Sequence, residues 1–216
     1  MHLVKLLAKK EVAENTLVFF LEKPKNFKFV PGQFITLYLK NNLAHDFSIA
    51  SSPKEKELII ATRMRDSSFK KLLGKIKVGD KIKIEGSSGQ FILHKNKKNP
   101  AVFLAGGIGI TPFRSMIKNF PNRKITLFYS NRKTEDAAFL DELKELENKN
   151  LKLVATMTKE KGKHINPKMI KENVKDWRRV IYYAVGSTGF VQFIADMLAK
   201  MKIKSENIKT ENFSGY

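Results

Sequence analysis

The fold of this chain is decided by the stretch Phe103-Leu104-Ala105-Gly106-Gly107-Ile108-Gly109-Ile110-Thr111-Pro112-Phe113. An apolar run of strand character leads into three glycines, which let the backbone approach a bound group closely. Thr111 is expected to cap a helix that begins at Pro112, where the missing N–H costs nothing. The free N–H groups and the dipole of such a helix start attract phosphate. The stretch therefore predicts an anion-binding turn, with a purely structural tight turn as the alternative.

Strands and helices alternate through the second half of the chain, the pattern of a parallel sheet with crossover helices. Strands are expected at 101–105, 125–129, 151–156, 180–185 and 208–210, and helices from 112 and at 135–147, 167–172 and 188–202. In the last helix, apolar residues recur every three or four positions, which indicates a stripe packed on the sheet. These residues are Phe190, Phe193, Ile194, Met197, Leu198 and Met201.

The first half has a different pattern, of short strands separated by turn signals. Strands are expected at 3–7, 16–21, 33–39, 46–50, 58–62 and 81–85, with one short helix near 68–73. This spacing is typical of an antiparallel β-barrel or sandwich. The pattern changes at the polar stretch 95–100, which ends in Pro. We therefore expect two domains: an antiparallel β-barrel at residues 1–98, followed by an α/β domain with a parallel sheet at residues 99–216.

Composition excludes several classes of protein. The chain has 216 residues, 42% of them hydrophobic, which suits a folded globular protein. Because it has no Cys, disulfides, Cys-ligated zinc, an iron–sulfur cluster on this chain and a thiol nucleophile are excluded. Its four histidines are too scattered for a metal-ligand motif, so no metal is expected. No apolar run reaches ~20 residues and the amino terminus is unlike a signal peptide, so we expect no membrane span and a cytoplasmic location.

The chain is strongly basic, with a formal net charge of +20. Its lysines are spread out and often alternate with apolar residues, as in Lys81-Ile82-Lys83-Ile84, where they mark the solvated face of a strand. A generally basic surface explains this pattern, and a basic face that steers an acidic protein partner or a polyanion is the alternative. Nucleic-acid binding would need an aromatic-rich strand for base stacking, which is absent from the sequence, so no nucleic-acid partner is expected.

Four motifs together resemble one family. Gly-Gly-x-Gly-x-Thr-Pro at 106–112 is similar to the pyridine-nucleotide motif of the ferredoxin–NADP reductase superfamily. Upstream, Pro-Gly-Gln-Phe at 31–34 resembles the entry to the third strand of that family's flavin-binding barrel, and residues 45–53 resemble its flavin motif. Gly-Ser-Ser-Gly-Gln-Phe at 86–91 looks like the turn that closes the barrel. The motifs occur in the family's order over nearly the whole chain.

The resemblance implies a flavin-dependent oxidoreductase with an FAD-binding barrel and an NAD(P)-binding α/β domain. Hydride would pass from NADPH or NADH to FAD, and electrons would pass on to an acceptor. That acceptor would be an acidic redox protein such as a ferredoxin or flavodoxin, or a small molecule such as free flavin or ferric chelate. A flavin-binding electron-transfer subunit, active only within a larger complex, is the alternative. Oligomeric state is left open.

In the flavin domain, the resemblance implies contacts on the strand that carries the flavin motif. His45 stands where relatives have a diphosphate-binding Arg, Phe47 would lie against the isoalloxazine ring, and catalytic Ser48 would hydrogen-bond the nitrogen that accepts hydride. Because His is a weaker, pH-dependent phosphate partner, part of the anion binding is expected to shift to the following strand and loop. A structural His45, a barrel-core Phe47 and a strand-end Ser48 are the alternatives. The contacts implied in the following strand and loop are Ile60, Thr62, Arg63, Ser67 and Ser68.

In the nucleotide domain, the implied contacts follow three strands. Ser130 and Arg132 follow the second strand, where relatives read the adenosine ribose; Arg132 would pair with a 2′-phosphate, although NADH-using relatives also carry Arg here. Gly186 and Ser187 match the turn beside the nicotinamide, where Val185 replaces a frequent Cys. The contacts implied in the first turn are Gly106, Gly107, Gly109, Thr111 and Pro112.

The carboxyl-terminal residues 210–216 resemble the family's terminal segment. Glu211 would place a carboxylate near the nicotinamide, and Phe213 matches an aromatic residue that covers the flavin. The resemblance makes both of these residues catalytic, with Phe213 also a cofactor contact. Tyr216 is expected to contact the cofactor as well, with a disordered tail as the alternative.

Overall fold

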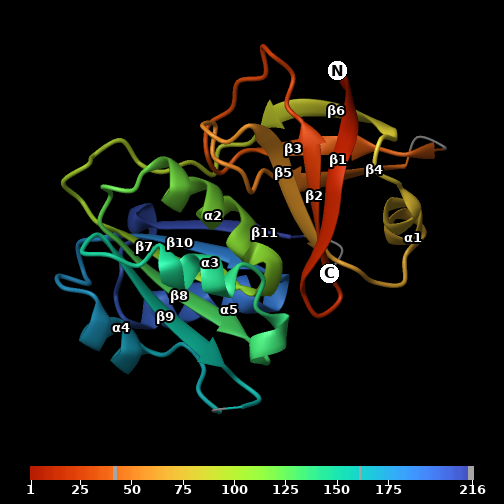
Figure 1. Ribbon diagram of the computed structural model, residues 1–216. Coiled ribbons are helices and arrows are strands. Elements are labelled where there is room, and N and C mark those ends of the chain that lie inside the picture. Colours follow the sequence, from red (N-terminus) through yellow and green to blue (C-terminus); the bar gives the residue numbers. More distant parts are fainter. Residues whose placement is uncertain (41–42, 161, 214–216) are drawn as a thin grey trace. The chain divides into compact units, whose positions relative to one another are not determined.

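The computed structural model describes residues 1–40, 43–160 and 162–213, and the chain divides into two compact units. Unit 1 contains Met1–Ile92 and Thr111–Asn119, and unit 2 contains Leu93–Ile110 and the chain from Phe120 onward. The chain therefore leaves unit 1, enters unit 2, returns for one helix and leaves again. Figure 1 follows this path by colour, from red at the amino terminus to blue at the carboxyl terminus.

Unit 1 is built on an antiparallel sheet of six strands, in the order β4-β3-β6-β1-β2-β5. The sheet is barrel-like but not closed, because β4 and β5 stand at its two edges. Every strand expected in this half of the chain is confirmed, and β1 extends further than predicted. The elements are β1 (His2–Ala13), β2 (Thr16–Glu22), β3 (Phe34–Tyr38), β4 (Ala44–Ser48), β5 (Glu57–Arg63), α1 (Ser68–Lys75) and β6 (Lys81–Ser88).

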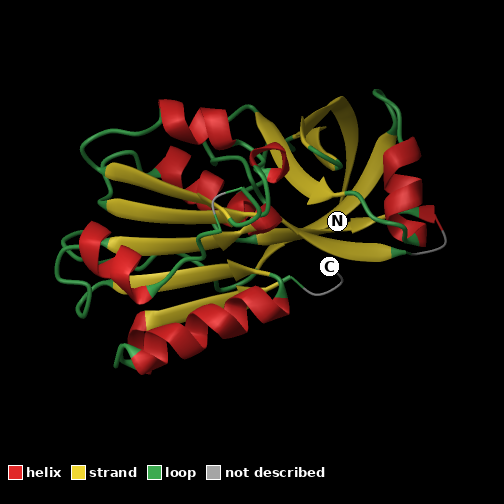
Figure 2. Ribbon diagram, turned by 90° about the horizontal axis from the view of Figure 1, so that it is seen from below, coloured by secondary structure: helices red, strands yellow, loops and turns green. Residues whose placement is uncertain are grey.

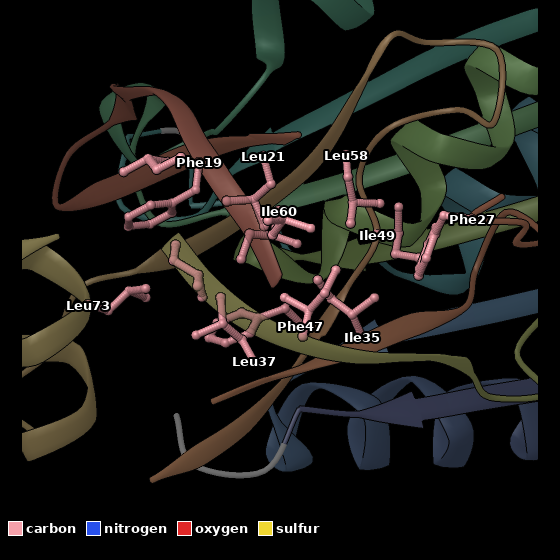
Figure 3. Close-up of a cluster of buried hydrophobic side chains, with 14 of the residues drawn as sticks. Phe19, Leu21, Phe27, Ile35, Leu37, Phe47, Ile49, Leu58, Ile60 and Leu73 are labelled. Carbon is pink, nitrogen blue, oxygen red and sulfur yellow. The ribbon is translucent and has the colours of Figure 1, made fainter. Parts of the chain in front are cut away.

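Alternating side chains explain why these segments form strands. In β6, Ile82 and Ile84 are buried whereas the lysines before each of them are exposed, so successive residues face the core and the solvent. The predicted solvated face of this strand is thereby confirmed. Inward side chains from several strands meet in one hydrophobic core, and Figure 3 shows Leu37, Phe47 and Ile60 inside it.

Unit 2 contains a parallel sheet of five strands, in the order β11-β10-β7-β8-β9. Its strands are β7 (Ala101–Gly106), β8 (Ile125–Asn131), β9 (Leu151–Met157), β10 (Ile181–Gly186) and β11 (Ile208–Asn212), and its helices include α3 (Leu140–Glu145), α4 (Pro167–Asn173) and α5 (Thr188–Lys200). All five strands expected from the sequence are present (Figure 2). The predicted fold class, an antiparallel barrel-like domain followed by an α/β domain with a parallel sheet, is confirmed, except that the barrel is not closed.

Helix α5 packs on β10, β7 and β11 through the predicted apolar stripe. Ile194, Met197 and Leu198 are buried against the sheet. Phe193, which was expected in the same stripe, is instead 48% exposed. A helix turns by about 100° per residue, so the position before Ile194 points away from the sheet.

Helix α2 (Ile110–Asn119) begins earlier than the sequence predicts. A 3-10 turn, η2 (Gly107–Gly109), leads directly into it, so the start at Pro112 was wrong. Thr111 consequently lies inside the first turn and is not the cap. Pro112 is still compatible with the helix, because residues of the first turn need no N–H donor within it.

The helix expected at 135–147 is broken into two pieces. A 3-10 turn, η3 (Thr134–Asp136), comes first, and α3 begins only at Leu140. Between them Phe139 has a φ of 60°, which places it in the left-handed region. A residue in that region cannot continue a right-handed helix, so the helical pattern is interrupted here.

Within unit 1, α2 is tied to the loop that follows β4. The buried Arg114 guanidinium donates hydrogen bonds to the Ala50 carbonyl oxygen at 2.7 Å and to the Glu55 carboxylate at 3.1 and 3.3 Å. One turn further along α2, the Lys118 ammonium lies 3.2 Å from the same carboxylate. The end of the strand that carries the predicted flavin motif is therefore held by two cations of α2.

The protonation of Glu55 follows from these contacts. Burial by itself would raise the pKa of Glu55, but the Ser52 N–H and the charges of Arg114 and Lys118 together bring it below its ordinary value of 4.5. A carboxyl group with a lowered pKa adds stability that is present above its unfolded value and is lost as the pH falls through its folded value.

We expect Glu55→Gln to lower the free energy of unfolding near pH 7 by about 2 kcal/mol, because the buried Arg114 would lose the negative charge of its partner. The loss stays modest because Glu55 is partly exposed to solvent. The difference from the wild type should shrink as the pH falls toward about 3. Urea titrations at both pH values measure it. Glu206→Gln is the control, because its contact with Lys204 at 3.7 Å is solvent-exposed. Equal losses in the two variants would contradict the role of the α2 contacts.

Candidate functional site

The carboxyl ends of β7 and β10 lie side by side where the order of the parallel sheet reverses. From β7 the chain continues to β8 and β9 on one side, and then returns to place β10 and β11 on the other. Open parallel sheets bind ligands outside the carboxyl ends of their strands at such a point. Gly106 and Gly186 are the last residues of these two strands, so the structure brings the two predicted glycine turns together.

The glycines of these turns serve different purposes. A Cβ on Gly106 or Gly186 would come within 2.7 or 2.8 Å of the Phe190 ring, so both leave room for that ring. A Cβ on Gly109 would lie 2.3 Å from the Val185 carbonyl oxygen, which shows how closely the turn approaches β10. Gly107 alone of the four has a left-handed φ, 54°, and its Cβ position is open. Its backbone is therefore presented to open space at the switch point.

The other predicted nucleotide contacts lie at this edge of the sheet or continue from it. Ser130 is half-buried and pairs with Gly106 in the sheet register, and exposed Arg132 comes just after β8. Ser187 caps α5, and its Oγ accepts the Phe190 N–H at 3.4 Å. Thr111 and Pro112 are buried in the first turn of α2, beyond the glycine turn.

The carboxyl-terminal strand adds a half-buried glutamate. Glu211 pairs with Val185 in the register, and the Phe213 N–H donates to the Gly186 carbonyl oxygen at 3.0 Å. Within the described part of the chain, Glu211 Oε2 has no hydrogen-bond partner, and burial raises the pKa of this group to about 7. Two of the three predicted terminal residues are thus held at the switch-point edge, whereas Tyr216 lies outside the described residues.

Glu211 should make stability depend on pH in a specific direction. The pKa of Glu211 is raised from 4.5 to about 7 in the folded state. The stability that Glu211 contributes is therefore fully present below its pKa in the unfolded chain, and it is lost as the pH rises through about 7. We expect Glu211→Gln to raise the free energy of unfolding near pH 8 by about 2 kcal/mol, after allowance for partial exposure, and to change little near pH 4. Chemical denaturation of both proteins between pH 4 and pH 8 measures this effect. A difference in the free energy of unfolding that stays constant over the range would contradict the raised pKa of Glu211.

Gly109 should tolerate a side chain less well than its neighbours. Gly109→Ala places a methyl group against backbone, so we expect a loss of more than about 2 kcal/mol and weaker nucleotide binding, because the turn must move. Gly107→Ala meets no atom and should cost about 1 kcal/mol for its left-handed φ. Gly189→Ala in α5 is the control and should be neutral or stabilising. Thermal unfolding of the three variants measures the order, and a mild Gly109→Ala would refute the close approach.

In unit 1, the predicted flavin residues of β4 differ in exposure. His45 is exposed, and its ring lies 4.4 Å from the Phe69 ring in an edge-on arrangement. Phe47 is buried in the barrel core beside Leu37 (Figure 3), with its ring centre 5.8 Å from that of Phe69. Ser48 is 8% exposed at the end of the strand and pairs with β3. Each side chain thus has a defined place, and a flavin contact by any of them stays a prediction.

The second group of predicted flavin residues lies on β5 and at the start of α1. Ile60 and Thr62 are buried in β5, and Arg63 at its end is half-buried. Ser67 is the cap of α1, where its Oγ accepts the backbone N–H of Lys70 at 3.2 Å. Ser68 is the first residue of the helix and is exposed. Hydroxyl groups and a guanidinium therefore gather at the loop between β5 and α1.

Sequence reasoning missed one residue of this region, Lys70. Its ammonium is buried, donates a hydrogen bond to the Thr62 Oγ1 and lies 4.8 Å from the centre of the Phe47 ring. No signal in the sequence marks it, because a lysine in a short basic helix is ordinarily solvated. Its place between two predicted flavin contacts appears only in the folded chain.

The residues present suit the two groups that the resemblance implies. At the switch point, an open glycine turn adjoins a helix start, and the buried Glu211 Oε2 lacks a partner within the described residues. At the other site the donor set, Arg63, Lys70 and the hydroxyls of Ser67 and Ser68, is cationic or neutral, as a diphosphate requires. The fit is therefore favourable for a nucleotide in unit 2 and for a phosphate-bearing flavin in unit 1.

Two family descriptions match the chain: an FAD-binding domain at residues 1–111 and an oxidoreductase NAD-binding domain at residues 103–196. Flavohemoprotein A of Dictyostelium discoideum is 28% identical over 240 residues, which cover 95% of this chain and 58% of that protein. The phthalate 4,5-dioxygenase oxygenase reductase subunit of Pseudomonas putida is 29% identical over 150 residues, which cover 65% of this chain and 46% of that protein. The chain spans about half the length of the curated relatives it matches.

A solved structure shows the same fold over the full length. The ferredoxin NADP+ reductase from Neisseria gonorrhoeae, with bound FAD and NADP, has a TM-score of 0.86 at 21% identity and 98% coverage of each chain. The chain thus combines an FAD-binding domain with an oxidoreductase NAD-binding domain, and its cofactors are FAD and NAD(P)H. The chain belongs to the ferredoxin–NADP reductase superfamily, as its motifs predicted. Among the described residues, no helix combines the length and apolarity needed to cross a membrane.

Proposed function

We propose that this chain is an NAD(P)H-dependent FAD oxidoreductase that passes electrons to a protein or small-molecule acceptor. The observation that carries the proposal is the pairing of the Gly106 and Gly186 turns at the switch point of a sheet joined to an FAD-binding domain. Residues 1–98 would bind FAD and residues 99–216 would bind NAD(P)H. The bound FAD supplies the chemistry, because its ring accepts hydride and can release electrons singly.

The protein's own task in this reaction is alignment. The open backbone at Gly107 and the helix start that follows it would hold the nucleotide diphosphate. Glu211 and Phe213, which are held beside Gly186 by the strand β11, would border the nicotinamide. Ser48 would offer its hydroxyl to the flavin nitrogen that receives hydride. No acid–base residue with a strongly shifted pKa is needed for hydride transfer itself.

NADPH is the preferred reductant in this proposal. Arg132 is exposed immediately after β8, where the resemblance places the adenosine ribose. A guanidinium can donate two parallel, charge-assisted hydrogen bonds to a phosphate. Its hydrogen bond to the uncharged ribose hydroxyl of NADH is weaker. NADPH should therefore bind more tightly than NADH.

The acceptor in this proposal is an acidic redox protein. The chain carries a net charge of +20, so its surface is strongly basic. Such a surface attracts an acidic partner and speeds encounter.

A second candidate function is an electron-transfer subunit that works only in a larger complex. One relative is named a reductase subunit, and this chain spans about half the length of the curated relatives it matches. In that case the chain would take up FAD and accept hydride, but it would not reduce dyes at a useful rate in isolation.

The proposal is tested by the absorbance of purified protein reconstituted with FAD, recorded anaerobically before and after NADPH or NADH. We expect the flavin band near ~450 nm to bleach, faster with NADPH, and ferricyanide to be reduced in steady state. Arg132→Ala should raise the KM for NADPH about tenfold and leave that for NADH unchanged, because only the 2′-phosphate contact is lost. Arg178→Ala, at an exposed position before β10, is the control.

Three outcomes distinguish the two candidate functions. Bleaching of the flavin band together with ferricyanide reduction supports the oxidoreductase, and bleaching without ferricyanide reduction supports the electron-transfer subunit. A protein that takes up no FAD, or one whose FAD is not reduced by either nucleotide, contradicts both.

A further inference from the structure

Lys70 occupies a place that is unusual for a lysine. It is the third residue of α1, it is only 8% exposed, and its ammonium lies against side chains of β4 and β5. Lysine is among the residues least often found fully buried, because its charge is costly to remove from water. The burial therefore needs a physical reason.

The neighbours of the ammonium are residues already implied as flavin contacts. It donates to the Thr62 hydroxyl and lies over the Phe47 ring at 4.8 Å. Phe47 in turn contacts Phe69, whose ring touches that of His45 at 4.4 Å. Lys70 thus stands in the same cluster as His45, the residue that replaces the family's diphosphate-binding Arg.

Three features raise the cost of a cation at this place. Burial and the nearby charge of Arg65 lower the pKa of Lys70 to about 8. In addition, Lys70 lies in the first turn of α1, where the helix dipole favours negative charge. The Thr62 hydroxyl and the Phe47 ring are among the groups that offset this cost. A bound anion beside the ammonium would lower the cost further.

We propose that Lys70 binds the FAD diphosphate and supplies the positive charge that His45 provides only weakly in place of Arg. The inference rests on the proposed function, because it requires FAD in unit 1. The diphosphate is favoured over the flavin ring because Lys70 follows directly on the Arg63–Ser68 loop, whose guanidinium and hydroxyl groups suit phosphate oxygens. Thr62 and Phe47 would fix the ammonium in position for it.

The proposal predicts opposite effects on the protein with and without flavin. Lys70→Met keeps the length of the side chain and removes its charge. Without FAD, this variant should unfold at a higher urea concentration than the wild type, because a buried charge is replaced by an apolar group. FAD affinity should fall about 30-fold, the loss expected for one charge-assisted hydrogen bond to phosphate. A residue with a merely structural role would change both quantities in the same direction.

The experiment titrates flavin-free protein with FAD, FMN and riboflavin, with quenching of flavin fluorescence as the readout. Lys70→Met should weaken FAD and FMN and leave riboflavin, which has no phosphate, unchanged. Lys70→Arg keeps the charge and should retain FAD affinity within about threefold. Lys75→Met, at an exposed position in the last turn of the same helix, is the matched control and should bind all three flavins normally.

Several results would overturn the inference. Unchanged FAD affinity in Lys70→Met excludes a phosphate contact, and an equal loss for riboflavin assigns Lys70 to the ring or to the core. Thr62→Val, which removes the hydroxyl partner and keeps the charge, provides a second variant and should weaken FAD by a smaller factor than Lys70→Met. If the wild-type protein binds no FAD at all, the proposed function itself fails, and this outcome is distinct from a Lys70 variant that binds as well as the wild type.

Discussion

The close approach between the glycine turn after β7 and the backbone of β10 is the constraint on which the candidate nucleotide site depends. The Val185 carbonyl oxygen would lie 2.3 Å from a Cβ on Gly109, so only glycine lets the turn pass there. This approach brings the ends of the two strands together where the strand order reverses. Phe190 fills the remaining space over Gly106 and Gly186, and Gly107 is left with its backbone open. The candidate diphosphate site therefore depends on the close packing at Gly106, Gly109 and Gly186 as much as on the left-handed backbone of Gly107.

Two buried charges show how the cofactors would complete the electrostatics of the chain. The pKa of Lys70 is lowered to about 8 in unit 1, and the pKa of Glu211 is raised to about 7 in unit 2, both chiefly through burial. Each group lies among residues for which a cofactor contact is inferred. Since burial of a charge is costly, the bound groups would restore part of the free energy that these positions cost. Glu55 is different, because Arg114 and Lys118 already offset its burial within the protein.

The sequence predicts the strands, their order along the chain and the fold class, because alternation and apolar runs depend on local pattern. The family resemblance also marks Gly106 and Gly186 as turn residues, and the structure shows that the two turns adjoin. The break at Phe139 was missed, since a left-handed residue leaves no mark when it is not glycine. Lys70 was missed for another reason. Its ammonium is buried by contacts with Phe47 of β4 and Thr62 of β5, and the sequence pattern of its own helix gives no sign of these contacts. Tertiary contacts of this kind are readable only from the folded chain.

The central claim is that FAD and the nicotinamide nucleotide bind at these two places in the chain. Amide chemical-shift perturbation by NMR on the 24.7 kDa protein tests it most directly, with FAD added first and NADP+ second. We expect FAD to shift the amide resonances of residues 45–48 and 62–70, and NADP+ to shift those of residues 106–111, 130–132 and 186–187. Shifts by NADP+ at the amino ends of the unit 2 strands, around Lys124 and Lys152, with none at the glycine turns, would contradict it.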